Sequence, residues 1–228
     1  MRKERRAIDW GEGGTVSAVI AYPQRHRPGV TPTVVLAHGA GNDMNNALLS
    51  GVHQGLAERG LVAVKFNFPY TEQGRRAPDR APVLEACYRA VIDTIRADPT
   101  LVPQTLIIGG KSMGGRMASH LAAQGVAVAG LLFLGYPLHP AGQPDKLRVA
   151  HLGAIMAPML FFAGTRDALC SLDLLRAALA KLPRATLHVI EGGDHSFALP
   201  RRMQRSAQEV VDEIVGASAD WIAQIARR

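Results

Sequence analysis

The stretch of sequence that decides the fold reads Leu106-Ile107-Ile108-Gly109-Gly110-Lys111-Ser112-Met113-Gly114-Gly115-Arg116. An apolar run ends in glycines, and Ser112 then stands between Gly110 and Gly114 in a Gly-x-Ser-x-Gly pattern. Glycines at these places permit a turn from strand to helix that larger side chains would block, which leaves the serine hydroxyl projecting. The first amides of the following helix would face the same point and stabilise negative charge there. The stretch therefore predicts a nucleophile elbow.

Two other interpretations of this stretch compete with the elbow. Gly-x-Ser-x-Gly arises by chance in glycine-rich chains, where it marks an ordinary strand-to-helix turn. The segment 110–112, Gly-Lys-Ser, also resembles the end of a phosphate-binding loop, which needs a glycine at the position that Thr105 occupies. Residues 106–108 are strand-like where such a loop would turn. The phosphate-binding interpretation is therefore weak.

Short apolar runs alternate with amphipathic segments along the whole chain. The 228 residues, 47% of them hydrophobic, suffice for one large α/β domain. A basic segment over residues 1–13 precedes this expected domain, which spans 14–228. The alternation predicts a mainly parallel sheet covered by helices on both faces, with ligands at the carboxyl ends of the strands. The expected strands are 15–22, 33–37, 61–66, 105–109, 126–134, 158–163 and 185–190; the expected helices are 46–59, 82–97, 113–124, 171–182 and 206–225.

Composition and charge exclude several classes of function. The net charge of +7 arises from scattered arginines, and only 5% of residues are aromatic, so we expect a solvated basic surface and no nucleic-acid partner. No apolar run approaches the roughly 18 residues of a membrane span, and no apolar segment of a secretory signal follows the charged start. Cys87 and Cys170 lack metal-ligand spacing, so we expect structural thiols in a reduced, cytoplasmic protein without metal or cofactor.

Three of the expected strands end in residues that together make a nucleophilic site. Ser112, Asp167 and His195 each lie just past a strand that is predicted to be buried, in that chain order. A serine hydroxyl needs a base, and the base needs a carboxylate that orients it. The order Ser–Asp–His is the one expected of an α/β-hydrolase. We therefore predict Ser112 as nucleophile, His195 as general base and Asp167 as the orienting acid.

The residue beside the predicted base offers a rival carboxylate. Asp194 precedes His195 directly and follows two glycines. Neighbouring side chains on one loop rarely point at each other, so Asp194 is interpreted as a residue that forms the turn.

Two backbone amides are expected to form the oxyanion hole. Met113 follows the nucleophile and supplies the first amide. The second is expected from Ala40, in the loop after the strand over residues 33–37. His38, at the end of that strand, is predicted to brace the loop through hydrogen bonds and to take no part in proton transfer.

The substrate pocket is predicted only in outline. The loop over residues 135–153 carries three prolines and is long for a compact domain, which favours a role in function. Each candidate pocket residue has core packing or loop anchoring as its alternative interpretation. The candidates are Phe68, Tyr70, Lys111, Tyr136, Leu138 and His139.

A resemblance to a known family rests on six segments of the chain, namely 36–41, 65–70, 109–116, 134–139, 164–167 and 193–197. The resemblance covers the chain from about Gly14 to its end, and it is to an α/β-hydrolase-like family. That family includes bacterial predicted hydrolases related to dienelactone hydrolases, animal testis-expressed hydrolase-like proteins and a subunit of the non-specific-lethal chromatin acetyltransferase complex. The resemblance implies an α/β-hydrolase fold with a small cap or none, and the triad Ser112, Asp167 and His195. Ser112 stands where dienelactone hydrolases typically carry cysteine.

The sequence thus predicts a serine hydrolase that acts on carboxylic esters or thioesters of a small molecule. A non-catalytic interaction module on the same fold is the alternative, prompted by the relative in the chromatin complex. Nucleic-acid binding through the basic surface is a third and weaker alternative, because no recognition motif accompanies it.

Overall fold

The computed structural model describes residues 1–11 and 14–227, and it contains one eight-stranded sheet. The strands follow the order β1-β2-β4-β3-β5-β6-β7-β8 across the sheet. β1 and β2 are antiparallel to their neighbours, and the six strands from β4 to β8 in that order run parallel. The strands are β1 (Arg2–Asp9), β2 (Thr15–Tyr22), β3 (Thr33–Ala37), β4 (Val62–Phe66), β5 (Leu106–Lys111), β6 (Gly130–Leu134), β7 (Met159–Gly164) and β8 (Ala185–Ile190).

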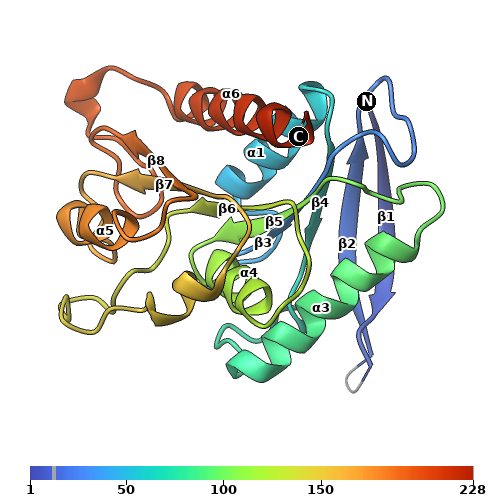
Figure 1. Cartoon of the computed structure of the whole chain (residues 1–228), viewed down its shortest axis with the longest axis horizontal. Helices are drawn as coiled ribbons and strands as arrows, with labels where there is room; N and C mark the ends of the chain where they lie inside the picture. Colours follow the sequence, from blue (N-terminus) through green and yellow to red (C-terminus); the bar gives the residue numbers. More distant parts are fainter. Residues whose placement is uncertain (12–13, 228) are drawn as a thin grey trace.

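Helices cover both faces of this sheet, as the alternating pattern predicts (Figure 1). α3, α4 and α5 bury their apolar sides against one face, and α1 and α6 pack against the other. Strands β3, β4 and β6 are buried along their whole length, which explains why their sequences are largely apolar. The α-helices are α1 (Ala47–Glu58), α2 (Pro69–Glu72), α3 (Ala81–Ala97), α4 (Met113–Ala123), α5 (Leu172–Leu179) and α6 (Ala207–Ala226); the 3-10 helices are η1 (Ala150–Ala154) and η2 (Arg201–Met203).

The basic N-terminal segment differs from its prediction. Residues Arg2–Asp9 form β1 and pair with β2 in register from Arg2 opposite Tyr22 to Asp9 opposite Thr15. The segment is therefore part of the sheet. The predicted boundary between residues 13 and 14 adjoins residues 12–13, which lie outside the described residues. The charged residues of the segment are consecutive over positions 2–6 of an edge strand, where they discourage pairing with a further chain. The strand was not predicted because its sequence is highly charged, whereas the patterns that indicate buried strands are apolar.

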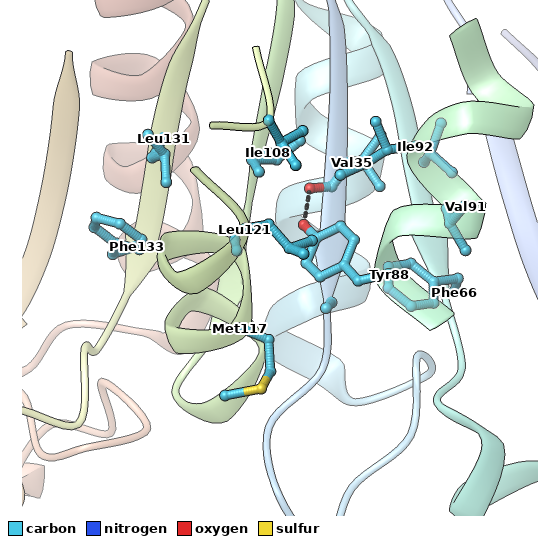
Figure 2. Close-up of a cluster of buried hydrophobic side chains, with 14 of the residues drawn as sticks. Val35, Phe66, Tyr88, Val91, Ile92, Ile108, Met117, Leu121, Leu131 and Phe133 are labelled. Carbon is cyan, nitrogen blue, oxygen red and sulfur yellow. Dashed lines mark hydrogen bonds between the residues drawn. The ribbon is translucent and has the colours of Figure 1, made fainter. Parts of the chain in front are cut away.

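The hydroxyl of Tyr88 ties the helical layer to the centre of the sheet. Tyr88 lies on α3 and is fully buried, and its hydroxyl lies 2.8 Å from the Val35 carbonyl oxygen and 2.7 Å from that of Gly109. The same oxygen accepts a hydrogen bond from the Gly109 amide at 2.9 Å. Figure 2 shows this side chain among the apolar residues between α3, α4 and the sheet. One hydroxyl thus joins β3 and β5 three residues before the predicted nucleophile, Ser112.

Tyr88→Phe is expected to lower the free energy of unfolding by about 1–3 kcal/mol, because it leaves the Gly109 amide without its acceptor in a dry core. Urea denaturation followed by circular dichroism measures this change. Tyr136→Phe is the matched control, because Tyr136 is also buried but donates to a single loop carbonyl, that of Arg148. An equal loss in both variants would contradict the special role of Tyr88.

No helix in the described ranges is long and apolar enough to cross a membrane.

Candidate active site

The turn between β5 and α4 has the geometry of a nucleophile elbow. Ser112 adopts φ 50° and ψ −114°, a strained conformation for a residue other than glycine. A Cβ atom at Gly110 would lie 2.1 Å from the Ala37 carbonyl oxygen, and one at Gly114 would lie 2.4 Å from the same atom. Only glycine permits this contact between β3 and the turn. Lys111 is the last residue of β5 rather than part of a turning loop, which argues against a phosphate-binding loop.

The three residues predicted from chain order lie in one hydrogen-bonded series. The Ser112 hydroxyl lies 2.9 Å from Nε2 of His195. Nδ1 of the same ring lies 2.8 Å from Oδ2 and 3.0 Å from Oδ1 of Asp167. An ionised carboxylate only accepts, so Nδ1 carries the proton and Nε2 is free to take one from the serine. This is the arrangement in which a serine can be activated for attack.

The Asp167 carboxylate is held from two sides. Its side chain has no exposed surface, and Oδ1 accepts a hydrogen bond from the Leu169 amide at 2.8 Å. The loop that carries it is fixed by His139, whose amide donates to the Leu169 carbonyl and whose Nε2 accepts from the Ser171 amide. His139 therefore supports the acid from the neighbouring 135–153 loop.

Asp194 shapes the loop of the base, as the sequence predicts. Its Oδ1 accepts hydrogen bonds from the amides of Ser196 at 2.8 Å and Ala198 at 2.9 Å. Within this turn Phe197 adopts φ 61°, in the left-handed region, and is buried. The carboxylate of Asp194 is thus engaged with backbone amides, whereas His195 bonds to Asp167.

His38 braces the loop after β3, which confirms its predicted structural role. It is fully buried, and its Nε2 accepts a hydrogen bond from the Phe68 amide at 3.1 Å. Nδ1 therefore carries the proton and donates to the Gly39 carbonyl at 2.9 Å. Burial lowers the pKa of His38, so the ring stays neutral. The Tyr70 hydroxyl donates to the same carbonyl at 3.4 Å.

The braced loop places one predicted oxyanion donor beside the nucleophile. The Asn42 amide donates to the Gly39 carbonyl, and Gly41 has φ 70°, so residues 39–42 form a tight turn with Ala40 at its exposed corner. Met113 is the first residue of α4, where an amide has no acceptor within the helix. Ala40 thus lines the same cavity as Ser112, and Met113 directly follows the nucleophile.

A cavity of about 530 Å³ opens at Ser112 and His195. Its walls come from the 39–42 turn, the loop after β8 and the N-terminal turns of α1 and α6, and none of its lining residues is acidic. Most are apolar or small, which suits an uncharged ligand. The lining residues are Gly39, Ala40, Asn42, Asn46, Ala47, Leu48, Gly51, Lys111, Ser112, Leu169, His195, Ser196, Phe197, Ala198, Ala207, Gln208, Val210 and Val211.

The structure corrects the outline of the pocket. Of the six candidate pocket residues, Lys111 alone lines this cavity. The other five are buried elsewhere: Phe68 and Tyr70 pack on His38, and Tyr136, Leu138 and His139 hold the 135–153 loop. The sequence shows that these side chains are large and near strand ends, but it does not show that they point inward. The contribution of α1 and α6 was missed, because it depends on how these helices cross.

Gly51 and Gly55 are the sequence signal that could have revealed this crossing. A Cβ atom at Gly55 would lie 2.7 Å from Cγ2 of Val215, and one at Gly51 would lie 3.1 Å from Cγ1 of Val211. Paired glycines four residues apart on one helix face allow a second helix to approach closely.

A second serine–histidine pair lies two turns further along α4. The Ser119 hydroxyl lies 2.7 Å from Nε2 of His151 and 2.7 Å from the Arg116 carbonyl oxygen. Burial, helped by His120 and Arg116, lowers the pKa of His151 to about 4. Ser119 is fully buried, neither residue lines the cavity, and no carboxylate of the described residues bonds to this imidazole. This pair packs α4 against η1 and lacks the features of a nucleophilic site.

The two cysteines have no part in this geometry. Cys87 and Cys170 are both free and buried, and burial raises the pKa of each thiol to about 12. They are therefore unreactive at neutral pH. In the parts of the chain that the structure describes, no group of three or more histidine, cysteine or acidic side chains could hold a metal ion.

Comparison with known proteins agrees with this architecture. The model of a family described as alpha/beta hydrolase domain matches residues 30–223. Among solved structures, dienelactone hydrolase from Anabaena variabilis is 19% identical with a TM-score of 0.75, covering 98% of this chain and 97% of that one. A serine hydrolase without a lid from Xanthomonas campestris is 20% identical with a TM-score of 0.69, covering 96% and 95%. A cold-adapted esterase from an Arctic intertidal metagenomic library is 20% identical with a TM-score of 0.70, covering 97% and 93%. At such identities these structures show the fold, and the match over residues 30–223 shows that the chain belongs to the alpha/beta hydrolase domain family.

Proposed function

We propose that this protein is a serine hydrolase that cleaves carboxylic esters or thioesters of small molecules. The observation that carries the proposal is the series Ser112–His195–Asp167, hydrogen-bonded end to end at the mouth of the 530 Å³ cavity. The fold is shared with a serine hydrolase and an esterase, which supports the same chemistry.

The reaction follows from the geometry of these groups. Ser112 attacks the substrate carbonyl while its proton passes to Nε2 of His195, and Asp167 stabilises the imidazolium that forms. The amides of Met113 and Ala40 hold the developing oxyanion. His195 then donates its proton to the leaving alcohol or thiol, which departs and leaves an acyl group on Ser112. Water, activated by the same histidine, hydrolyses the acyl-enzyme.

Turnover of p-nitrophenyl acetate together with labelling by a fluorophosphonate tests this function. We expect hydrolysis, stoichiometric labelling, and a modified peptide that maps to Ser112. A pure, folded protein that neither hydrolyses the ester nor reacts with the probe would overturn the proposal and favour the non-catalytic interaction module.

The lining of the cavity favours substrates whose ester carries an apolar chain. Leu48 of α1 and Val210 and Val211 of α6 form its wall, and a carboxylate is absent from the lining. An apolar chain placed there loses contact with water and packs against these aliphatic side chains, while the ammonium nitrogen of Lys111 is shielded from the cavity. The protein is therefore expected to prefer esters with an apolar chain over charged ones.

Leu48→Trp is expected to lower the ratio of kcat/KM for hexanoate over acetate by about tenfold, because a filled pocket rejects additional methylenes. Leu48→Ala is expected to raise that ratio. Matched series of p-nitrophenyl acyl esters and of n-alkyl acetates show whether the acyl or the alcohol chain enters the cavity. Leu147→Trp is the control, because Leu147 is exposed in the 135–153 loop and does not line the cavity. If Leu147→Trp alone changed this ratio of kcat/KM tenfold, the substrate chain would bind at the 135–153 loop instead of in this cavity.

A further inference from the structure

The side chain of Lys111 is buried beside the proposed triad without a hydrogen-bond partner. The residue is 8% exposed, and its ammonium nitrogen has no acceptor among the described residues. An unpaired buried ammonium is costly, because nothing replaces the water that it loses. Burial lowers the pKa of Lys111 to about 8, against the attraction of two carboxylates, Asp167 and Asp194. A group kept at such a cost beside a nucleophile calls for a physical explanation.

The position of this ammonium relates it to the base. A Cβ atom built on Gly135 would lie 3.2 Å from Nζ of Lys111, 3.0 Å from the His195 carbonyl oxygen and 3.6 Å from Nδ1 of the His195 ring. The ammonium and the imidazole edge that faces Asp167 therefore lie on the same side of Gly135, in the space that a side chain at this position would occupy. Nζ is shielded from solvent, although other atoms of Lys111 reach the cavity wall.

The charges around Lys111 come from two loops. Asp167, fully buried, faces it from the loop after β7, and Asp194, half-buried, faces it from the loop after β8 together with His195. The loops after the flanking strands β3 and β6 place Gly39 and Gly135 against it, and these residues carry no charge. Water screens Asp194, so Asp167 is the negative charge that the ammonium mainly balances.

We propose that Lys111 is a positioning residue of the proposed hydrolase, whose buried ammonium neutralises Asp167 and opposes protonation of His195 before substrate binds. With Lys111 positive, Asp167 negative and His195 neutral, the resting group has no net charge. When the serine proton moves to His195 and an oxyanion forms, two opposite charges appear together and the sum stays zero. Without the ammonium, the charges of Asp167, the imidazolium and the oxyanion would sum to minus one in this buried site.

The sign of the expected effect follows from the charge removed. Lys111→Met keeps the length of the side chain and removes its charge, so the imidazolium of His195 becomes easier to form. The His195 titration midpoint is expected to move up by about one pH unit. Because catalysis needs the neutral ring, the acid limb of kcat/KM against pH moves up with it. At its plateau, where His195 is neutral, kcat and KM are expected to stay within a few-fold of the unaltered protein, because the lost repulsion of the imidazolium offsets the lost attraction of the oxyanion.

NMR titration of the His195 ring, assigned with His195→Gln, measures the midpoint without any turnover. Lys65→Met is the matched control, because Lys65 is also a buried strand lysine but donates to Ser50, away from the cavity. The control is expected to leave the midpoint and the acid limb in place. In the unaltered protein, the His195 ring signal is expected to show a second step near pH 8 as Lys111 loses its proton, a readout that does not depend on the variant folding.

Three results would overturn the assignment. One is an unchanged midpoint in Lys111→Met, and another is an absent second step near pH 8 in the unaltered protein. The third is a selective rise in KM for anionic esters with the acid limb in place, which would make Lys111 a substrate-binding residue. The proposal rests on the hydrolase function, but the NMR titration does not depend on it. If the protein had no esterase activity and the His195 midpoint still moved in Lys111→Met, the function would be refuted and the electrostatic coupling between Lys111 and His195 would stand.

Discussion

Ser112→Ala is expected to lower kcat/KM for p-nitrophenyl acetate by about a thousandfold or more, and to abolish fluorophosphonate labelling. The reason is chemical, because the variant removes the only hydroxyl within hydrogen-bonding distance of Nε2 of His195 in the described structure. Oxyanion donors and the cavity remain, so a residual rate above that of water is expected. Stopped-flow release of p-nitrophenolate and intact-protein mass spectrometry measure the two effects.

Ser119→Ala is the matched control for this prediction. Ser119 lies on the same helix and contacts its own histidine, His151, at 2.7 Å. It lies outside the cavity, so the variant is expected to keep labelling and to hold kcat/KM within a few-fold of the unaltered protein. Labelling lost in Ser119→Ala and kept in Ser112→Ala would transfer the nucleophile to the second pair.

The elbow and the triad could be predicted because their determinants are local. A glycine is required wherever a Cβ would clash with a backbone carbonyl, as at Gly110 and Gly114. A turn of this geometry therefore needs the Gly-x-Ser-x-Gly pattern, which can be recognised in the sequence. Parallel strands place their carboxyl ends at one edge, so Asp167 and His195 converge from chain order alone. The buried apolar runs of β3 and β6 were recognisable for a similar reason.

The substrate cavity could not be predicted, because it is a property of packing between distant elements. Its walls depend on the approach of α1 to α6 through Gly51 and Val211, which are separated by most of the chain. The 135–153 loop had the composition of a functional loop, yet its residues 135–139 are buried and hold the acid loop through His139, whereas residues 141–147 are exposed. The length and proline content of a segment indicate that it is irregular, but they do not show which way its side chains point.

Asp167→Asn is expected to lower kcat by about 10⁴-fold while the fold is retained, since an amide in place of the orienting carboxylate favours the wrong imidazole tautomer. The amide oxygen can still accept from the Leu169 amide, as Oδ1 does now. The amide NH₂ then faces Nδ1 of His195 and forces that nitrogen to accept, which places the proton on Nε2. A protonated Nε2 cannot take the proton of Ser112.

Asp194→Asn supplies the matched comparison, one residue from the base. The amides of Ser196 and Ala198 both donate to Oδ1 of Asp194, and an asparagine side chain keeps that acceptor. This variant is therefore expected to retain kcat within a few-fold. Rates for both variants at a pH where His195 is neutral separate the tautomer effect from the titration. A large loss in Asp194→Asn with activity preserved in Asp167→Asn would identify Asp194 as the orienting acid, and would mean that the loop after β8 rearranges when substrate binds.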